Sequence, residues 1–348
     1  MRFFVDFDSG DMIRCWVVPD NPVAVSRIVV KVDGCREAEL SASIVDDTFR
    51  SLGWHSTGQC TFVITEMEVP GLARMPRLEI YDADTNVLVH RRCPQDGLVQ
   101  GRLLLINASI NPENALQGLF FRHFQQSYFG IGKMSEEVLK SALETQSLTS
   151  AFLSGALTIP RFEHLFPPEK YLTTVLVHDP HVEMATRLFW LRERAEIAAD
   201  PARNWRLGKL AEAATFAAEY DFEDPKSLKR LFRMLPEPAY HLLYNPLTRQ
   251  FGTRLPDDRL HPGNSIVAIE ILARVGIVGH RDYYDAFVST VLDRLGIADA
   301  IPRPEPIPAE VAALAQRLKG IRAVADMLVF DVAMADAVRS SVAKSWGG

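Results

Sequence analysis

Short runs of alternating apolar and polar side chains fill the first 95 residues of the chain. They predict strands over residues 12–18, 27–32, 39–45, 60–65, 77–81 and 87–91. Turn-forming residues separate the runs, as at Ser9–Gly10–Asp11 and Asp33–Gly34. Strands of this length and spacing predict a compact β-sandwich over residues 1–96.

The pattern changes period near residue 97. Residues 103–106 form a short apolar run, and Asn111 followed by Pro112 marks the start of a helix. The run 172–177 is apolar throughout, as in a buried parallel strand, and one long helix is predicted from there to residue 199.

The rest of the chain adds predicted elements of both kinds. A helix is predicted over 135–144, an extended run over 149–158, and a mostly helical region over 205–342 with a proline-rich break at 301–308. The alternation of strands and helices predicts an α/β domain over residues 97–348. The predicted fold class is therefore α/β with an N-terminal all-β domain.

Composition and charge exclude several classes of protein. The length of 348 residues favours two domains, and 47% hydrophobic with 24% charged residues is typical of a globular protein. A net charge of −6 gives no reason to expect nucleic acid as a partner. The sequence contains no glycine-rich dinucleotide or nucleoside triphosphate loop, no serine-hydrolase elbow and no zinc-protease motif.

The N-terminal residues, the longest apolar stretch and the cysteines indicate the location of the chain and the state of its thiols. The first eight residues become acidic too early for a secretory signal, so the chain is predicted to be cytoplasmic. The longest apolar stretch, 265–279, is interrupted by Glu270 and Arg274 and is shorter than the roughly 20 residues of a membrane span. The four cysteines lie in the first 93 residues without a CxxC pair, so no metal site is expected, although a disulfide stays open. The sequence is also compatible with a homo-oligomer.

Part of the N-terminal region resembles a known type of module. The run GDMIRCWVV from Gly10, then Asn21–Pro22, then VKVDG from Val30, resembles the immunoglobulin-like modules found beside glycosyltransferases in bacterial polysaccharide loci. The resemblance implies an immunoglobulin-like sandwich. Trp16 is interpreted as a packing residue, since a large aromatic side chain on a strand normally anchors a core.

Three segments of the second region, in order, resemble the nucleotide-dependent sulfotransferase superfamily. They are LVHDPHVEMATRLF from Leu176, YNPLTRQFG from Tyr244, and VGHRDYYDAF from Val278 with a following leucine–glycine pair. The resemblance implies a P-loop-type parallel sheet, 3′-phosphoadenosine 5′-phosphosulfate (PAPS) as the donor, and a glycan or glycolipid acceptor. Sulfuryl transfer depends on positioning and charge neutralisation, so the donor phosphates need cationic and N–H groups.

The residues that would hold the donor depart from the family pattern. The resemblance implies donor contacts from Asn107 and Ser109 in the first loop and from Thr186, which stands where the family has Ser, but the loop lacks the family's Lys and Gly. His178 and Glu183 stand where the family has two Arg residues. An imidazole replaces a guanidinium poorly and a carboxylate repels phosphate, so the loss of two contacts of roughly 1.5–3 kcal/mol each weakens donor binding by orders of magnitude.

The remaining candidates lie on the acceptor side and at a strand end. The resemblance implies substrate contacts from Asn245, Thr248 and Arg249, and a helix-end salt bridge is the alternative role for Arg249. His178 is the candidate catalytic base because ligands of open α/β sheets bind at the carboxyl ends of strands. With His181 it gives two histidines and no third positioned ligand, which does not make a metal site.

Two functions are compatible with these residues. The first is a sulfotransferase-like enzyme of surface-polysaccharide metabolism that transfers a sulfuryl group to a glycan. The second is a catalytically inactive relative that binds a glycan or holds together enzymes of polysaccharide assembly. The kept segments support the first function, and the lost positive charges support the second.

Overall fold

A computed structural model of the chain describes residues 1–19, 21–94, 96–134, 136, 138–140, 149–255 and 257–346. The helix predicted over 135–144 lies mostly outside these ranges. By contacts the chain divides into two compact units, the first made of residues 1–104 with 118–154 and the second of residues 105–117 with 155–348. The chain therefore passes between the units three times.

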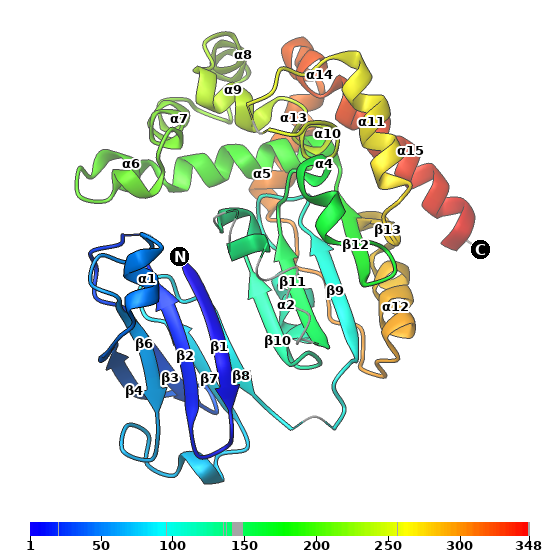
Figure 1. Ribbon diagram of the computed structural model, residues 1–348. Helices are drawn as coiled ribbons and strands as arrows, with labels where there is room; N and C mark the ends of the chain where they lie inside the picture. The colour runs from blue at the N-terminus through cyan, green and yellow to red at the C-terminus, as the bar shows by residue number, and fades with distance from the viewer. Residues whose placement is uncertain are drawn as a thin grey trace. The chain divides into compact units, whose positions relative to one another are not determined.

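The first unit begins with two antiparallel sheets of four strands each (Figure 1). Their orders are β1-β2-β6-β5 and β4-β3-β7-β8. The strands are β1 (Arg2–Asp8), β2 (Ile13–Val18), β3 (Arg27–Val32), β4 (Cys35–Ser41), β5 (Ile44–Val45), β6 (Gln59–Ile64), β7 (Leu78–Asp82) and β8 (Leu88–Arg92), with the short helix α1 (Asp47–Ser51) before β6.

The inward side chains of the two sheets share one hydrophobic core. On β2 the alternate residues Ile13, Cys15 and Val17 are fully buried, and they pack with residues of β3, β6, β7 and β8. This confirms the predicted all-β N-terminal region. All four cysteines are free thiols, and burial raises the pKa of Cys15 to about 12.

Strand β8 also bonds to a later part of the first unit. The guanidinium of Arg91 donates hydrogen bonds to the carbonyls of Phe121 and Phe124, and the side-chain amide of Gln126 donates to the Leu88 carbonyl at 3.3 Å. The antiparallel sheets are thus tied to residues 121–126 of their own unit.

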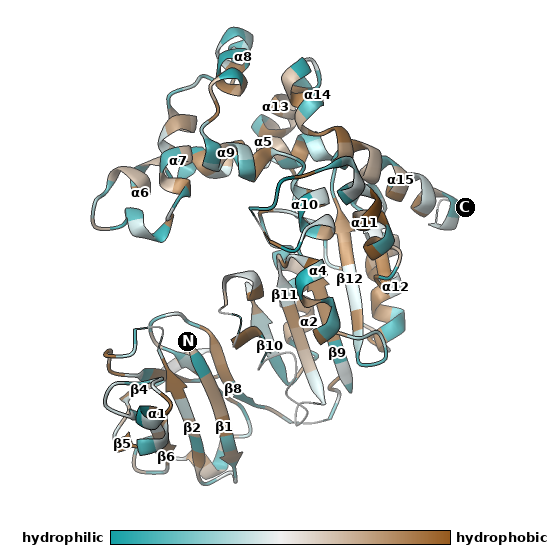
Figure 2. Ribbon diagram, turned by 45° about the horizontal axis from the view of Figure 1, so that its top comes forward, coloured by the Kyte–Doolittle hydropathy of each residue, from teal (hydrophilic) through white to brown (hydrophobic). Residues whose placement is uncertain are grey.

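A five-stranded parallel sheet follows, with the order β10-β11-β9-β12-β13. Its strands are β9 (Gly101–Ile106), β10 (Gln126–Phe129), β11 (Ser150–Gly155), β12 (Tyr171–Val177) and β13 (Ile277–His280). The two apolar runs that the sequence predicts as buried strands, β9 and β12, are neighbours in this sheet, and β12 is mainly hydrophobic in Figure 2. The α/β layout is therefore confirmed, while β10 and β13 were missed.

The strand order determines where a ligand can bind. From β9 the chain moves to the edge strand β10, whereas from β12 it moves to the opposite edge strand β13. Connections that leave two neighbouring strands in opposite directions create a crevice at their carboxyl ends. The ends of β9 and β12 form that switch point here.

The second unit is mainly helical after β12. Its helices are α4 (Ile159–Phe162), α5 (Pro180–Glu193), α6 (Ala195–Ala199), α7 (Leu210–Ala218), α8 (Pro225–Arg233), α9 (Glu237–Leu243), α10 (Pro246–Gly252), α11 (Pro262–Leu272), α12 (Tyr284–Leu295), α13 (Ala309–Lys319), α14 (Arg322–Met327) and α15 (Val329–Trp346), and α2 (Asn114–Phe121) follows β9. The predicted long helix to residue 199 is broken at Arg194 into α5 and α6.

One apolar cluster joins α5, α7, α8, α9, α13 and α14, and it includes the fully buried Leu188, Leu228 and Leu314. In Figure 1 α5 begins at the carboxyl end of β12, so the cluster holds α5 and α13 beside that end of the strand. Within the described part of the chain, none of the helices combines the length and the apolar character needed to cross a bilayer.

Candidate functional site

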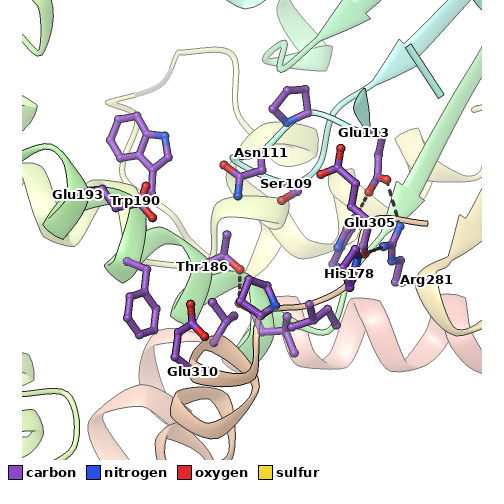
Figure 3. Close-up of a pocket in the computed structure, with 17 residues that line it drawn as sticks. Ser109, Asn111, Glu113, His178, Thr186, Trp190, Glu193, Arg281, Glu305 and Glu310 are labelled. Carbon is purple, nitrogen blue, oxygen red and sulfur yellow. Dashed lines mark hydrogen bonds and ion pairs between the residues drawn. The ribbon is translucent and has the colours of Figure 1, made fainter. Parts of the chain in front are cut away.

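A cavity of about 150 Å³ lies at the carboxyl ends of β9, β12 and β13 (Figure 3). Ser109 and Glu113 line it from the segment after β9, His178 follows β12, and Arg281 follows β13. Side chains of α5 and of residues 305–311 complete its wall. The cavity occupies the switch point of the sheet, and we call it the acidic pocket because carboxylates dominate its charge.

Glu113 is the centre of the polar contacts in the acidic pocket. Its Oε1 lies 2.9 Å from Nε2 of His178, and its Oε2 lies 3.0 Å from Nη1 of Arg281. Burial alone raises the pKa of Glu113, but the hydrogen bonds and charges of His178 and Arg281 outweigh burial and lower it. Glu113 is therefore ionised at neutral pH and fixes the orientation of both partners.

The start of α5 explains why His178 lies at the end of β12. The carboxylate of Asp179 accepts hydrogen bonds from the backbone N–H groups of His181 (2.8 Å) and Val182 (3.1 Å), and Pro180 is the first helical residue. Burial raises the pKa of Asp179, but these bonds and the His181 side chain lower it overall. The ionised cap directly follows His178, and the helix begins at the next residue, Pro180.

The loop after β9 has the place of an anion cradle, yet a carboxylate of the chain already occupies it. The backbone N–H of Ile110 donates to Oε1 of Glu183 at 2.8 Å, and Nε of Arg187 lies 2.7 Å from the same oxygen. Glu183 is only 6% exposed. Glu183, the residue expected from the sequence to repel a donor phosphate, therefore accepts the hydrogen bond of the Ile110 amide itself.

Charge and aromatic side chains give the acidic pocket its chemical character. Four carboxylates line it, and Arg281 is the one Lys or Arg among the lining residues. Phe189 and Trp190 of α5 form its aromatic side. The carboxylates are those of Glu113, Glu193, Glu305 and Glu310. Such a wall disfavours an anion and offers acceptors to hydroxyl groups.

The acidic pocket shares part of its wall with a second hollow of about 470 Å³. Phe189, Glu193 and Glu310 line both cavities, and the second adds the ring of Phe222. The guanidinium of Arg192 lies over that ring, 4.4 Å from its centre. We call the two cavities together the α5–α13 groove, because α5 and α13 supply most of the residues that line the second one.

The structure places three of the sequence-predicted residues together. Ser109, His178 and Thr186 all line the acidic pocket. The hydroxyl of Thr186 donates to the Val182 carbonyl one turn earlier at 2.8 Å, so its oxygen keeps acceptor capacity toward the cavity. Sequence reasoning assigned these three residues and Asn107 to the first two strand ends, and Asn107 does not line the pocket.

Asn245 and Thr248, by contrast, lie in the interior. Both are fully buried, and the Thr248 N–H and hydroxyl both donate to Oδ1 of Asp331 at 2.7 Å, while Oδ1 of Asn245 accepts from the N–H of Asp331. Burial raises the pKa of Asp331, and the bonds from Thr248 offset part of that rise. In this structure the motif joins α10 to α15.

Asn107 and Arg249 lie outside the acidic pocket. The backbone of Asn107 donates to the Gly155 carbonyl at 3.0 Å and accepts from the side chain of Gln250 at 2.9 Å. Arg249 lines a separate cavity and donates to the Asp258 carbonyl at 2.7 Å. Residues of the resembling segments therefore line two different cavities, and others form the buried contact between α10 and α15.

Sequence reasoning missed Glu113 and Arg281. Arg281 follows β13, a strand that the sequence pattern did not reveal, and the strand-end rule would have placed it in the pocket. Its neighbour His280 is buried, which lowers its pKa, and its Nδ1 accepts from the Asp282 N–H at 3.2 Å. Among the residues that the structure describes, no group of three His, Cys, Asp or Glu side chains could hold a metal ion.

Comparison with known proteins does not place the chain in a family. No protein-family model matches the sequence, and no curated protein is similar to it. The resemblance to sulfotransferases and to immunoglobulin-like modules therefore stays a prediction that depends on the quoted segments.

Proposed function

We propose that the protein binds a neutral glycan in the α5–α13 groove and is a non-catalytic relative of the sulfotransferases. The observation that carries the proposal is the hydrogen bond from the Ile110 amide to Glu183, a carboxylate of the chain itself. A relative that still used a phosphorylated donor would need that amide for the donor. The protein would then act by holding a surface polysaccharide or the enzymes that assemble it.

Size and charge both argue against PAPS in the acidic pocket. Small-molecule sites usually measure about 300–1,000 Å³, and this cavity of about 150 Å³ is smaller than that range. A nucleotide with several negative charges would also meet four carboxylates beside the one guanidinium of Arg281, whose Nη1 already pairs with Glu113. The residues present do not fit that donor, and we derive no reaction step through it.

The same wall suits a chain of hydroxylated rings. The half-buried Phe189 and Trp190 offer apolar faces on which sugar rings can pack, and aromatic side chains commonly dominate such contacts. The carboxylates of Glu193 and Glu310 accept strong, charge-assisted hydrogen bonds from hydroxyl groups. Two cavities that share Phe189, Glu193 and Glu310 fit an extended ligand better than a compact one.

A second candidate function has one specific observation in its favour. His178 lies 2.9 Å from Glu113 at the end of β12, and a carboxylate that orients an imidazole is the usual arrangement for a general base. The second candidate is therefore a transferase in which His178 takes the proton of an acceptor hydroxyl.

Calorimetry separates glycan binding from donor binding. We expect no heat with adenosine 3′,5′-bisphosphate at millimolar concentration, and measurable binding of at least one neutral hexasaccharide from a panel. Trp190→Ala should weaken that binding about tenfold or more, while Trp205→Ala, which removes an exposed indole from outside the groove, should leave it unchanged. Micromolar affinity for the nucleotide, or equal effects of the two variants, would overturn the proposal.

The transferase candidate has its own measurement. Incubation with radiolabelled PAPS and the same glycans should give no labelled glycan if the chain is non-catalytic. Labelled product that disappears in His178→Ala would replace the first proposal with the second.

A further inference from the structure

Arg249 lines a second cavity, which differs from the acidic pocket in size and in charge. The cavity has a volume of about 580 Å³ and lies between the segment after β11 and the helices α5, α9 and α10. Its volume falls within the range of about 300–1,000 Å³ that is usual for small-molecule sites. We call it the basic pocket.

Permanent positive charge exceeds negative charge on its wall. Arg187, Lys209 and Arg249 line the cavity, together with the carboxylates of Glu237 and Asp257. The three cations outnumber the two carboxylates by one, whereas carboxylates dominate the acidic pocket. Glu183 neutralises Arg187 from behind the wall, so Arg249 and Lys209 are the cations that favour a ligand with a single negative charge, which the acidic pocket disfavours.

The two arginines are held in place before any ligand arrives. Arg187 is paired through Nε with Glu183 and donates through Nη1 to the Leu242 carbonyl at 3.1 Å, with its side chain 12% exposed. Arg249 donates through Nη1 to the Asp258 carbonyl. Guanidinium groups that are already oriented lose little conformational entropy when they bind a carboxylate.

The third cation is weakly held and can turn toward a ligand. Nζ of Lys209 lies 3.6 Å from Asp257, and the side chains are 85% and 74% exposed. Exposed pairs of this kind contribute little to stability, so an anion can compete for the ammonium group.

Apolar side chains form the rest of the cavity. Leu157, Leu210 and Leu242 contribute from three separate segments of the second unit, and prolines of α9 and α10 extend the surface. A ligand that fills this space buries apolar area, which adds roughly 25 cal/mol per Å² to its binding. The cavity thus combines an apolar wall with oriented cations.

We propose that the basic pocket binds a small organic acid, a monocarboxylate whose body packs on the leucines while its carboxylate bonds to Arg249 and Lys209. This site is independent of the glycan groove, because its residues are not those of the α5–α13 groove. The carboxylate geometry suits a guanidinium, which can donate two parallel hydrogen bonds.

Paired probes test the proposal on the whole chain. D-glucuronate carries one carboxylate on a sugar ring, and 3-phenylpropionate carries one on a chain that ends in a phenyl ring. Glucuronamide and 3-phenylpropionamide are their uncharged counterparts. In NMR titrations we expect at least one acid to bind, at least tenfold more tightly than its amide, and more weakly as salt rises. If neither acid shifts any resonance at 10 mM, or if an amide binds as well as its acid, the proposal fails.

Variants locate the binding. Lys209→Gln changes an exposed side chain, so the fold should persist while acid affinity falls about threefold, and Arg249→Gln should lower it tenfold or more. Lys229→Gln, an exposed lysine of α8 that does not line the cavity, is the matched control. Equal affinity in Lys209→Gln and Lys229→Gln would overturn the assignment. Trp190→Ala should leave acid binding unchanged, which separates this result from that of the glycan groove.

Discussion

The acidic pocket and the basic pocket both open where the chain leaves the strands of the parallel sheet, but they carry opposite charge. The first lies beyond β9, β12 and β13 and is lined by four glutamates, and the second lies beyond β11 and is lined by Arg187, Lys209 and Arg249. The fold therefore predicts where ligands bind, whereas the side chains determine which ligands bind.

Helix α5 serves both cavities because its faces differ. Thr186, Phe189, Trp190 and Glu193 follow the spacing of one helical stripe and line the acidic pocket. Arg187 lies on another face of α5 and lines the basic pocket, and its Nε pairs with Glu183 of the same helix. The Glu183–Arg187 pair thus connects the loop after β9 to the basic pocket.

The largest expected effect comes from removing the support of α10, which carries Arg249. Asp331 is buried and accepts hydrogen bonds from the N–H groups of Leu247 and Thr248 and from the Thr248 hydroxyl. Asp331→Ala leaves these donors unsatisfied and should lower the free energy of unfolding by at least about 3 kcal/mol, measured by urea denaturation. Asp336→Ala, an exposed carboxylate of the same helix, should change it by less than about 0.5 kcal/mol. Equal losses of stability in the two variants would show that the hydrogen bonds between Asp331 and α10 are not the cause of the loss.

Breaking the pair between the two pockets should have the next largest effect. Glu183→Gln leaves the largely buried guanidinium of Arg187 without its counter-charge and should cost about 3 kcal/mol of stability. Arg187→Gln should cost a similar amount, and the double variant should cost clearly less than the sum of the two. If the double variant lost as much stability as the sum of the two single variants, the two side chains would act independently.

A pH dependence tests the charge of the acidic pocket. The pKa of Glu113 is lower in the folded state than in the unfolded state. Its contribution to the stability of the fold is therefore fully present above the unfolded-state pKa of about 4.3, and it is lost as the pH falls through the folded-state pKa. The stability difference between the wild type and Glu113→Gln should therefore be about 1–3 kcal/mol at pH 7 and should shrink below about pH 4. Urea denaturation at a series of pH values measures it. A difference that stays constant down to pH 3 would contradict the assignment.

The smallest expected effect tests the ligand-facing side of α5. Thr186→Val removes a hydroxyl that donates a hydrogen bond to a carbonyl of its own helix, and Thr and Val have similar helix propensities. Stability should change by less than about 0.5 kcal/mol, while calorimetry should show glycan affinity reduced a few-fold. Thr290→Val, which removes the same kind of bond on α12, is the matched control and should leave affinity unchanged.

Strong local patterns allowed much of the fold to be predicted from the sequence. Alternation identified β2, β3, β6, β7 and β8, and the continuous apolar runs identified β9 and β12. The strands β10 and β13 are only four residues long and lie at the sheet edges, so they carry too little pattern to be recognised. β13 also follows shortly after the apolar helix α11, so the change from helical to strand periodicity is not visible in the sequence.

The candidate site was predicted in part for the same reason. His178, Ser109 and Thr186 follow recognised strands or lie on the helix after one, and the structure brings them together. Arg187 lies one helical turn after Glu183, but the role of Glu183 was not predictable because its other partner, Ile110, becomes a neighbour only through the tertiary fold. Asn245 and Thr248 gave no signal that they face Asp331, which lies more than 80 residues later.

The repeated passage of the chain between its two units limits how the protein can be divided. No single cut separates residues 1–104 with 118–154 from the rest. A fragment that ends at residue 96 would lose the carbonyl of Phe124 as partner of Arg91, and the side chain of Gln126 as partner of Leu88. A fragment cut at residue 96 would therefore expose polar groups that are bonded in the uncut chain, and work on separate fragments needs residues 1–348 as the reference.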